Sequence, residues 1–305
     1  MALRRRIRQA VDEATFGLGR QVPVAVFMYH SVHPDAGTGW GPWAYAVTPE
    51  TFERHLDWIT DRYDVRPLTD IVASCRAGSP PTEPTAAITF DDGFRDNLTE
   101  ALPLLERYDV PATVYVAGTY LDGQSPYEYR LAAKLRDASR VAVDVDGRRV
   151  DRELTDDESR RAAYEELRRD LKFERRDTRE RVVSAVDGVA ESAPAMLTSA
   201  ELRDLAASPL VDIGAHGYEH VPLSRLDEGP LREDIARSQS TLEAALGESV
   251  ALFSYPYGNL SERVTTAVRA AGFEAAVTTV PRRLPASRVA ESRFELPRYD
   301  GADLS

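Results

Sequence analysis

Two adjacent aspartates end a short apolar stretch at residues 86–93, which read Ala-Ala-Ile-Thr-Phe-Asp-Asp-Gly. The uncharged residues before them predict a buried strand that ends at Phe90. Neighbouring carboxylates repel each other unless a proton or a cation holds them, so Asp91 and Asp92 indicate a metal ion at the end of this strand. Asp-Gly alone is a common turn and recurs elsewhere in the chain, so the indication comes from the doubled aspartate and its place after a strand.

The same strand belongs to a series of apolar stretches that alternate with helical patterns. Thr48 before Pro49 and the Thr198–Glu201 capping box mark two helix starts. This alternation predicts an α/β fold with a mainly parallel sheet covered by helices. The expected strands are 22–29, 86–90, 110–116, 211–214, 250–253 and 273–278, and the expected helices are 49–61, 97–108, 198–205, 230–246 and 261–270.

Residues 125–195 interrupt this alternation. Val141, Val143 and Val145 alternate with polar residues before an Asp146-Gly147 turn, which predicts a hairpin, and strongly charged helices are expected from about 156 to 190. The segment contains no histidine, so we expect metal chemistry to lie elsewhere. We interpret it as an insertion or helical cap on one barrel domain that spans residues 22–300.

The first 21 residues predict a helical extension. Leu3, Ile7 and Val11 recur at helical spacing beside a basic cluster formed by four arginines of residues 4–8. A short amphipathic helix that packs on the domain is one interpretation, and peripheral contact with a membrane surface is the other. No apolar stretch typical of a signal peptide or a transmembrane helix is visible, so a cytoplasmic location is expected.

Charge and cysteine content exclude several classes of function. The chain has 305 residues and a formal net charge of −12, with 43% hydrophobic and 29% charged residues. An acidic protein repels phosphate groups, so a nucleic-acid partner is not expected. The single cysteine, Cys75, excludes an internal disulfide and a cysteine-rich zinc site.

Two of the five histidines, His216 and His220, follow another apolar strand. A spacing of four allows both imidazoles to reach one ion, on a helix face or across a turn, and the neighbouring Gly214 and Gly217 favour the turn. Two histidines and one carboxylate form a common catalytic zinc set, for which Asp92 could supply the carboxylate. The alternative is a pair of surface or hydrogen-bonded histidines.

Two further strand ends carry candidate side chains. Tyr255-Pro-Tyr-Gly258 could form a groove wall and offer a backbone N–H to a developing oxyanion, or it could be an aromatic turn that packs in the core. His30 could be a general acid near neutral pH, or a hydrogen-bonded structural residue. His55 is expected on an exposed helix face.

Together these segments resemble the polysaccharide deacetylase family, the NodB-type carbohydrate esterases that remove acetyl groups from N-acetylated sugars. The resemblance covers residues 22–120 and 196–300. Phe-Asp-Asp-Gly at 90–93 is similar to the first motif of the family, His-x-x-x-His at 216–220 to the second, and Tyr-Pro-Tyr-Gly at 255–258 to the third. The resemblance implies a distorted (β/α) barrel that carries a helical insertion.

The resemblance also implies a role for each motif residue. Asp91 would be the catalytic base, and Asp92, His216 and His220 would be metal ligands. Tyr257 would contribute its backbone N–H to the oxyanion site, with Tyr255 and Pro256 beside it.

The branch with the poly-N-acetylglucosamine deacetylases has a permuted motif order, with a Met-Tyr-His segment near the N-terminus. Residues 28–30 match that segment, which makes His30 the candidate acid. The C-terminal Asp-Trp and Leu-x-His motifs of the family are not visible, and Phe253-Ser254 replaces the arginine of its third motif. Arg298 is the candidate for orienting Asp91, with a plain salt bridge as the alternative.

The expected function is therefore metal-dependent removal of N-acetyl groups from a polysaccharide, oligosaccharide or glycolipid. The family and the ligand types favour Zn²⁺ over other divalent transition metals. One alternative is hydrolysis of another amide or a cyclic ureide. The other is a glycan-binding pseudoenzyme that uses Trp40, Trp43 and Tyr45 as a sugar-stacking platform.

Overall fold

Short apolar stretches, three of them buried at every position, form a central sheet, and the stretches of helical period between them form the helices around it. The computed structural model describes residues 22–37, 46–123, 125–188 and 193–304. The expected helical extension at 1–21 and the aromatic platform of Trp40, Trp43 and Tyr45 lie outside these residues.

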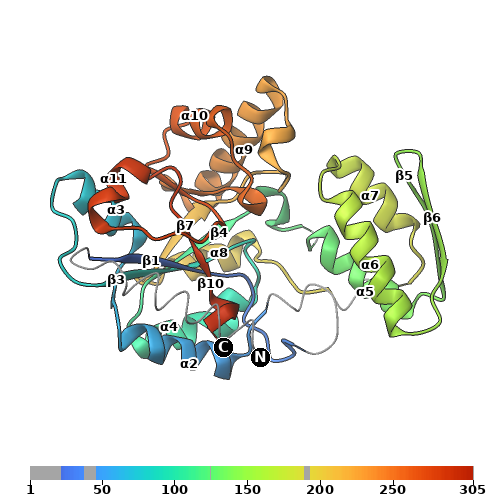
Figure 1. Ribbon diagram of the computed structural model, residues 1–305, viewed down its shortest axis with the longest axis horizontal. Coiled ribbons are helices and arrows are strands. Elements are labelled where there is room, and N and C mark those ends of the chain that lie inside the picture. The colour runs from blue at the N-terminus through green and yellow to red at the C-terminus, as the bar shows by residue number, and fades with distance from the viewer. Residues whose placement is uncertain (1–21, 38–45, 124, 189–192, 305) are drawn as a thin grey trace.

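The sheet is parallel at every pairing and runs in the order β10-β1-β3-β4-β7-β8-β9, with β2 also paired to β3 (Figure 1). This confirms the predicted α/β class. The strands are β1 (Val24–Tyr29), β2 (Asp64–Val65), β3 (Thr85–Phe90), β4 (Ala112–Val116), β7 (Val211–Ala215), β8 (Leu252–Ser254), β9 (Ala275–Val277) and β10 (Tyr299–Asp300).

The chain segment that ends in β10 contacts both edges of this curled sheet. Leu296 bridges to Val277 of β9, and three residues later Tyr299 pairs with Phe27 of β1. The segment thus joins the two edges and produces a distorted barrel. We did not expect β10, because two residues are too few to show a period.

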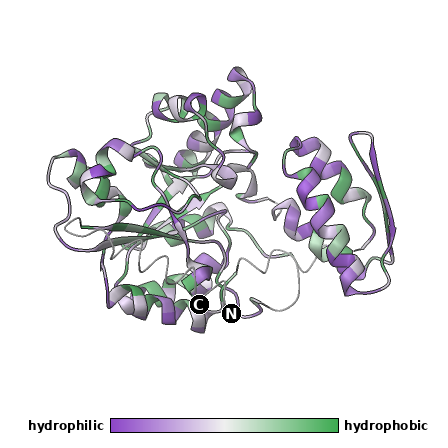
Figure 2. Ribbon diagram, viewed as in Figure 1, coloured by the Kyte–Doolittle hydropathy of each residue, from purple (hydrophilic) through white to green (hydrophobic). Residues whose placement is uncertain are grey.

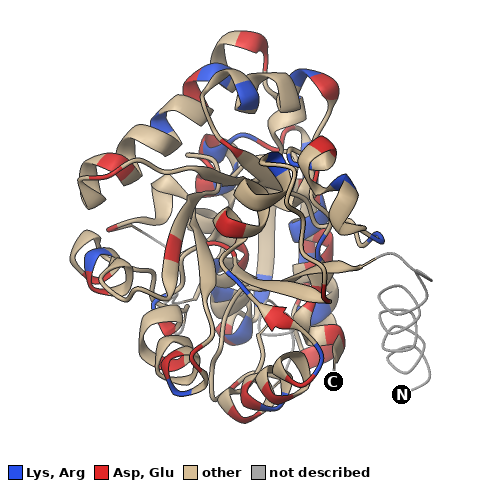
Figure 3. Ribbon diagram, turned by 90° about the vertical axis from the view of Figure 1, so that its left-hand side faces the viewer, with Lys and Arg blue, Asp and Glu red and all other residues tan. Residues whose placement is uncertain are grey.

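Helices surround the barrel. Charged residues of both signs lie on these helices and the loops around the sheet (Figure 3), while the strands of the sheet are predominantly apolar (Figure 2). The helices are α2 (Pro49–Thr60), α3 (Leu68–Arg76), α4 (Leu102–Tyr108), α8 (Ser199–Ala206), α9 (Glu228–Leu246), α10 (Glu262–Ala270) and α11 (Val289–Ser292).

Two of the predicted helix starts are confirmed, and one predicted helix has an irregular first turn. The Thr48 side chain accepts a hydrogen bond from the Thr51 N–H, and Thr198 and Glu201 form a capping box. The helix expected at 97–108 opens with a π-helical turn at Asn97–Ala101 before α4. Such turns are frequent beside functional sites, and this one follows the Asp-Asp-Gly motif.

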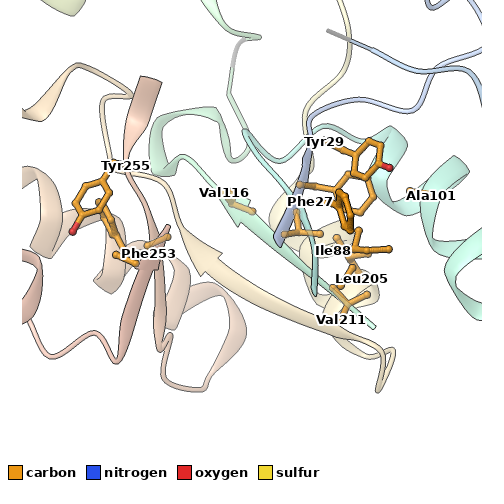
Figure 4. Close-up of a cluster of buried hydrophobic side chains, with 14 of the residues drawn as sticks. Phe27, Tyr29, Ile88, Ala101, Val116, Leu205, Val211, Phe253 and Tyr255 are labelled. Atoms are coloured by element: carbon orange, nitrogen blue, oxygen red, sulfur yellow. The ribbon is translucent and has the colours of Figure 1, made fainter. Parts of the chain in front are cut away.

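Side chains alternate strictly between the two faces of the sheet. Phe27, Ile88 and Phe253 belong to the large hydrophobic cluster between the sheet and the helices (Figure 4). Val26, Ala87 and further alternate residues of five strands belong to a separate cluster. This period of two decides which residues at the strand ends face the site.

The inserted segment forms a lobe beside the barrel, which we call the insertion lobe and define as residues 125–188 (Figure 1). It contains the predicted hairpin and a hydrophobic cluster of its own. The division of the chain into an extension and one barrel domain with an insertion stays a prediction. The elements of the lobe are α5 (Tyr127–Asp137), β5 (Arg140–Val145), β6 (Arg148–Glu153), α6 (Asp157–Leu171) and α7 (Arg176–Ala185).

Candidate active site

The ends of three parallel strands bring the polar residues of distant motifs together. Asp91 follows β3, His216 follows β7 and Ser254 ends β8. Parallel strands all end at one edge of the sheet, where α/β proteins build their sites. Each of the three follows a residue that points towards the outer helices, so its own side chain points to the opposite face of the sheet. The Ser254 hydroxyl lies 3.4 Å and His216 Nε2 3.9 Å from Asp91 Oδ2.

Asp92, His216 and His220 form a compact group of possible metal ligands. One ligand atom of each lies within 4.8 Å of the others, and all three residues are buried. Oδ1 of Asp92 lies 3.5 Å from His216 Nε2 and 3.1 Å from His220 Nε2. This Oδ1 is buried, and none of the residues that the structure describes forms a hydrogen bond with it. A buried carboxylate oxygen without a partner, aimed at two imidazole nitrogens, fits a cation between the three.

The opposite nitrogen of each imidazole is held by the protein. Nδ1 of His216 donates to the Ser254 carbonyl at 2.8 Å, and Nδ1 of His220 lies 3.2 Å from the Tyr120 hydroxyl. Such partners fix the ring orientation and leave Nε2 for the ion. Burial lowers the pKa of His216 to about 4, so its imidazole is neutral and able to coordinate near pH 7.

The backbone is strained at the same place. Asp92, His220 and Tyr257 have φ angles of 77°, 48° and 59° without being glycine. Each left-handed residue costs about 1–3 kcal/mol and persists only where the surroundings enforce it. Three of them in one site indicate that the positions of these side chains, and of the Tyr257 N–H, are fixed by contacts from elsewhere in the fold.

Asp91 is held by Arg298, the residue that we expected to orient it. Nη1 of Arg298 donates to Oδ1 of Asp91 at 2.7 Å, and Nη2 donates to Oδ2 at 2.6 Å. The arginine is fully buried, and its Nη2 also donates to the Ser254 hydroxyl at 3.0 Å. Ser254, which replaces the third-motif arginine, therefore takes part in holding the carboxylate.

This ion pair controls the charge of Asp91. Burial alone would raise its pKa, but the Arg298 guanidinium and its hydrogen bonds, together with His216, hold the pKa well below the usual range. Asp91 is therefore ionised at any working pH and presents a carboxylate beside the metal-ligand group. A bidentate arginine also fixes the orientation of that carboxylate.

A pocket of about 230 Å³ opens over these residues. His30, Asp91, Asp92, His216, His220 and Tyr257 all line it. The Asn97 side chain donates to the carbonyl of His30 at 2.9 Å, which anchors the turn that carries the candidate acid. The structure thus brings the predicted acid, base, metal ligands and oxyanion donor around one cavity.

One wall of the pocket comes from the insertion lobe, which sequence analysis had not connected with the site. Its lining residues include Glu128 of α5 and Tyr164 and Arg168 of α6, together with Lys172. The Tyr257 hydroxyl donates to Glu128 at 2.8 Å. Highly charged helices are typical of solvated surfaces, and no local pattern marks the few side chains that face a distant pocket.

Two of the predicted site residues do not reach the pocket. The Tyr255 side chain is fully buried in the cluster beneath the helices (Figure 4), where its hydroxyl donates to the Phe294 carbonyl at 2.9 Å. Pro256 is buried beside Gly217 and does not line the pocket either. The prediction was wrong for the Tyr255 side chain because Tyr255 follows Ser254 directly, so these two residues point to opposite faces of the sheet. Pro256 begins the turn after β8, outside the strand, and packs against Gly217.

His55 also differs from expectation. It is 4% exposed and lies on the face of α2 that packs against β1, with its Nδ1 3.3 Å from the Tyr29 hydroxyl. An imidazole on a helix face is compatible with core packing when a polar partner is present, and Tyr29 supplies one.

Comparisons with known proteins identify the family and the fold. The family described as polysaccharide deacetylase matches residues 78–276. The chain belongs to the polysaccharide deacetylase family. This membership confirms the predicted enzyme class, a carbohydrate deacetylase that acts as a hydrolase.

Individual relatives are distant. YxkH of Bacillus subtilis (strain 168), named as a candidate polysaccharide deacetylase, is 19% identical over 278 residues, which are 90% of this chain and 72% of YxkH. Streptococcus pyogenes deacetylase PplD, solved in complex with acetate, superposes with a TM-score of 0.60 at 16% identity, covering 93% of this chain and 97% of PplD. BA0330 of Bacillus anthracis superposes with a TM-score of 0.58 at 16% identity over 92% of this chain, which spans 65% of BA0330. These likenesses support the barrel fold.

The helices that the structure describes include none with the length and apolar character needed to cross a membrane.

Proposed function

We propose that this protein is a metal-dependent N-deacetylase of an N-acetylated carbohydrate. One observation carries the proposal: a carboxylate held in place by an arginine lies beside three side chains that can share one ion, and all four line a single pocket. Amide hydrolysis needs a base and an electrophile within reach of one carbonyl, and this arrangement provides for both.

Asp92, His216 and His220 would hold the metal ion. Two imidazole nitrogens and a carboxylate oxygen are a common catalytic set for Zn²⁺, which keeps a position open for water or substrate. The bound ion supplies Lewis-acid chemistry, because it polarises a carbonyl and lowers the pKa of water. Both Nε2 atoms face Asp92, and its buried Oδ1 has no hydrogen-bond partner within the described part of the chain, which supports this assignment.

Asp91 would be the general base. Its carboxylate accepts a proton from the attacking water while Arg298 and Ser254 keep it in place. The backbone N–H of Tyr257 would donate to the carbonyl oxygen as that atom gains negative charge. Such a donor is typically worth about 10²–10³ in rate.

His30 would protonate the leaving nitrogen, so that the C–N bond breaks to give acetate and a free amine on the sugar. His30 directly follows the end of β1 and lines the pocket, which supports this role.

Acetate release from N-acetylated oligosaccharides tests the proposal. We expect the zinc-loaded wild type to release acetate, and a chelator, Asp91→Asn or His216→Ala to abolish release. Asp151→Asn is the control, because this carboxylate lies on the exposed hairpin of the insertion lobe, paired with Arg140. Equal release by the wild type, the two site variants and the chelated protein would contradict the proposal.

A further inference from the structure

A buried arginine of the insertion lobe contacts the backbone of a metal ligand. Arg179 lies in α7 and is 3% exposed. Its Nη1 donates to the carbonyl oxygen of His220 at 2.9 Å. His220 belongs to the barrel, 41 positions further along the chain, so this hydrogen bond joins the lobe to the site.

The other donors of Arg179 hold the end of a helix. Its Nε donates to the Leu171 carbonyl at 3.1 Å, and its Nη2 donates to the Lys172 carbonyl at 2.6 Å. These carbonyls lie at the C-terminus of α6, where backbone carbonyls carry partial negative charge, and that of Leu171 also accepts from the Glu174 N–H at 3.0 Å. The guanidinium also lies 4.7 Å from the ring centre of Tyr127. One planar group thus binds the His220 carbonyl and the end of α6 in a fixed relation.

The conformation of His220 explains why this contact matters. Its φ of 48° is left-handed, so the peptide after it would relax to an ordinary conformation if nothing held it. Arg179 holds the carbonyl, and the Tyr120 hydroxyl contacts Nδ1 of the same residue. On the other side of the turn, Asp234 accepts from the backbone N–H groups of Tyr218 and Glu219, each at 2.9 Å.

We propose that Arg179 is a positioning residue through which the insertion lobe sets the metal affinity of the site. It fixes the backbone of His220, so that Nε2 faces Asp92 before an ion arrives. The inference rests on the metal site of the proposed function and adds to it that the lobe is a working part of that site. Neither the family motifs nor any pattern around residue 179 marks this arginine.

Zinc affinity of purified variants tests the inference without an activity assay. Arg179→Met removes the three donors and retains an apolar chain of similar length. Arg130→Met is the matched control, because Arg130 forms a bidentate pair with Glu180 between α5 and α7 of the same lobe and is not bonded to His220. Each protein is stripped of metal, titrated with Zn²⁺ against a chelator of known affinity, and followed by thermal unfolding in the metal-free state.

We expect Arg179→Met to weaken zinc binding by about 10–100-fold, the usual effect of removing a group that orients a metal ligand. Arg130→Met should bind zinc as the wild type does, even where its metal-free form unfolds at a lower temperature. Arg179→Lys should fall between the wild type and Arg179→Met, because a lysine reaches one carbonyl but lacks the planar fork. If Arg179→Met does not fold, Arg179→Lys compared with Arg130→Met decides the question.

The outcomes separate this inference from the proposed function. Wild-type zinc affinity in Arg179→Met, or an equal loss in Arg130→Met, overturns the inference and leaves deacetylation untouched. A wild type that binds zinc but releases no acetate contradicts the proposed function. The zinc titration of the Arg179 variants then still decides the inference about metal affinity. A wild type that binds no zinc overturns both.

Discussion

Asp92, His220 and Tyr257 show how far individual residues in this site depart from local preference. All three adopt left-handed backbone conformations that glycine would adopt without strain. Each contributes something that glycine cannot, a carboxylate, an imidazole or an aromatic side chain bonded to the insertion lobe. The observed strain therefore coincides with chemistry, and contacts such as those of Arg179 and Glu128 offset its cost.

Arg298→Lys should impair the proposed base, Asp91, without changing the zinc affinity of the metal site. Lysine retains the charge but cannot form two parallel hydrogen bonds, so Asp91 loses its fixed orientation and its pKa rises towards the ordinary value. We expect kcat to fall by about 10²-fold, as for other small misplacements of a reacting group. In zinc-saturated enzyme the acidic limb of the kcat/KM profile should move to higher pH. An unmoved limb, or a matching loss of zinc affinity, would show that Arg298 does not act through Asp91.

Asp96 predicts a pH-dependent stability. Burial raises its pKa to about 7, against hydrogen bonds from Ser31 and Val32 that favour the ionised form. The folded state therefore holds a proton that the unfolded state releases near pH 4, and the stability conferred by that proton is lost as pH rises through about 7.

Asp96→Asn carries the neutral form at every pH. Between pH 5 and pH 8 the free energy of unfolding of the wild type should fall relative to this variant by about 2–3 kcal/mol. Urea denaturation of both proteins at the two pH values measures the difference. A constant difference between the two proteins would mean that Asp96 is ionised throughout.

At the scale of single elements, the alternation of side chains between the two faces of a strand, which we call strand parity, is the most useful rule for placing residues at the site. The strands β1, β3 and β7 were predicted to within two residues at either end, because each is a short apolar run between helical patterns. Parity would also have placed Ser254 at the site and Tyr255 in the core, since inward and outward residues alternate from Leu252 onward. The error over Tyr255 came from transferring a whole motif to the site instead of alternate residues.

A substitution of Gly214 in β7 tests how tightly side chains pack on the inner face of the barrel. A Cβ at this position would overlap the ring of Tyr115, the residue of β4 that pairs with Gly214. Gly214→Ala should therefore lower the free energy of unfolding by about 1–3 kcal/mol, as other overpacked sites do. Adding Tyr115→Leu should recover part of the loss, which gives the double variant a non-additive stability.

Gly229→Ala provides the control for this experiment, because a Cβ there meets nothing and the residue lies in α9. It should be neutral or stabilising by up to about 1 kcal/mol. Additive effects of Gly214→Ala and Tyr115→Leu would contradict the packing that we describe.

At the scale of the molecule, the barrel fold was predicted from the sequence and its motifs, and most of the motif residues lie around one pocket, while their roles stay a proposal. The sequence did not predict how the barrel closes or what the insertion contributes. Closure depends on two residues of β10 and one bridge at Leu296, which are too short for any period. The insertion lobe reaches the site through single side chains such as Arg179 and Glu128, and only the folded chain shows which charges face inward.

The location of a bound metal ion tests the central claim most directly. Crystals of the protein soaked in Zn²⁺ and measured at the zinc absorption edge would show the ion by its anomalous scattering. We predict one strong peak, about 2.0–2.2 Å from Nε2 of His216, Nε2 of His220 and a carboxylate oxygen of Asp92. A zinc-soaked crystal with no peak between these three residues, or with its principal peak elsewhere, would contradict the account.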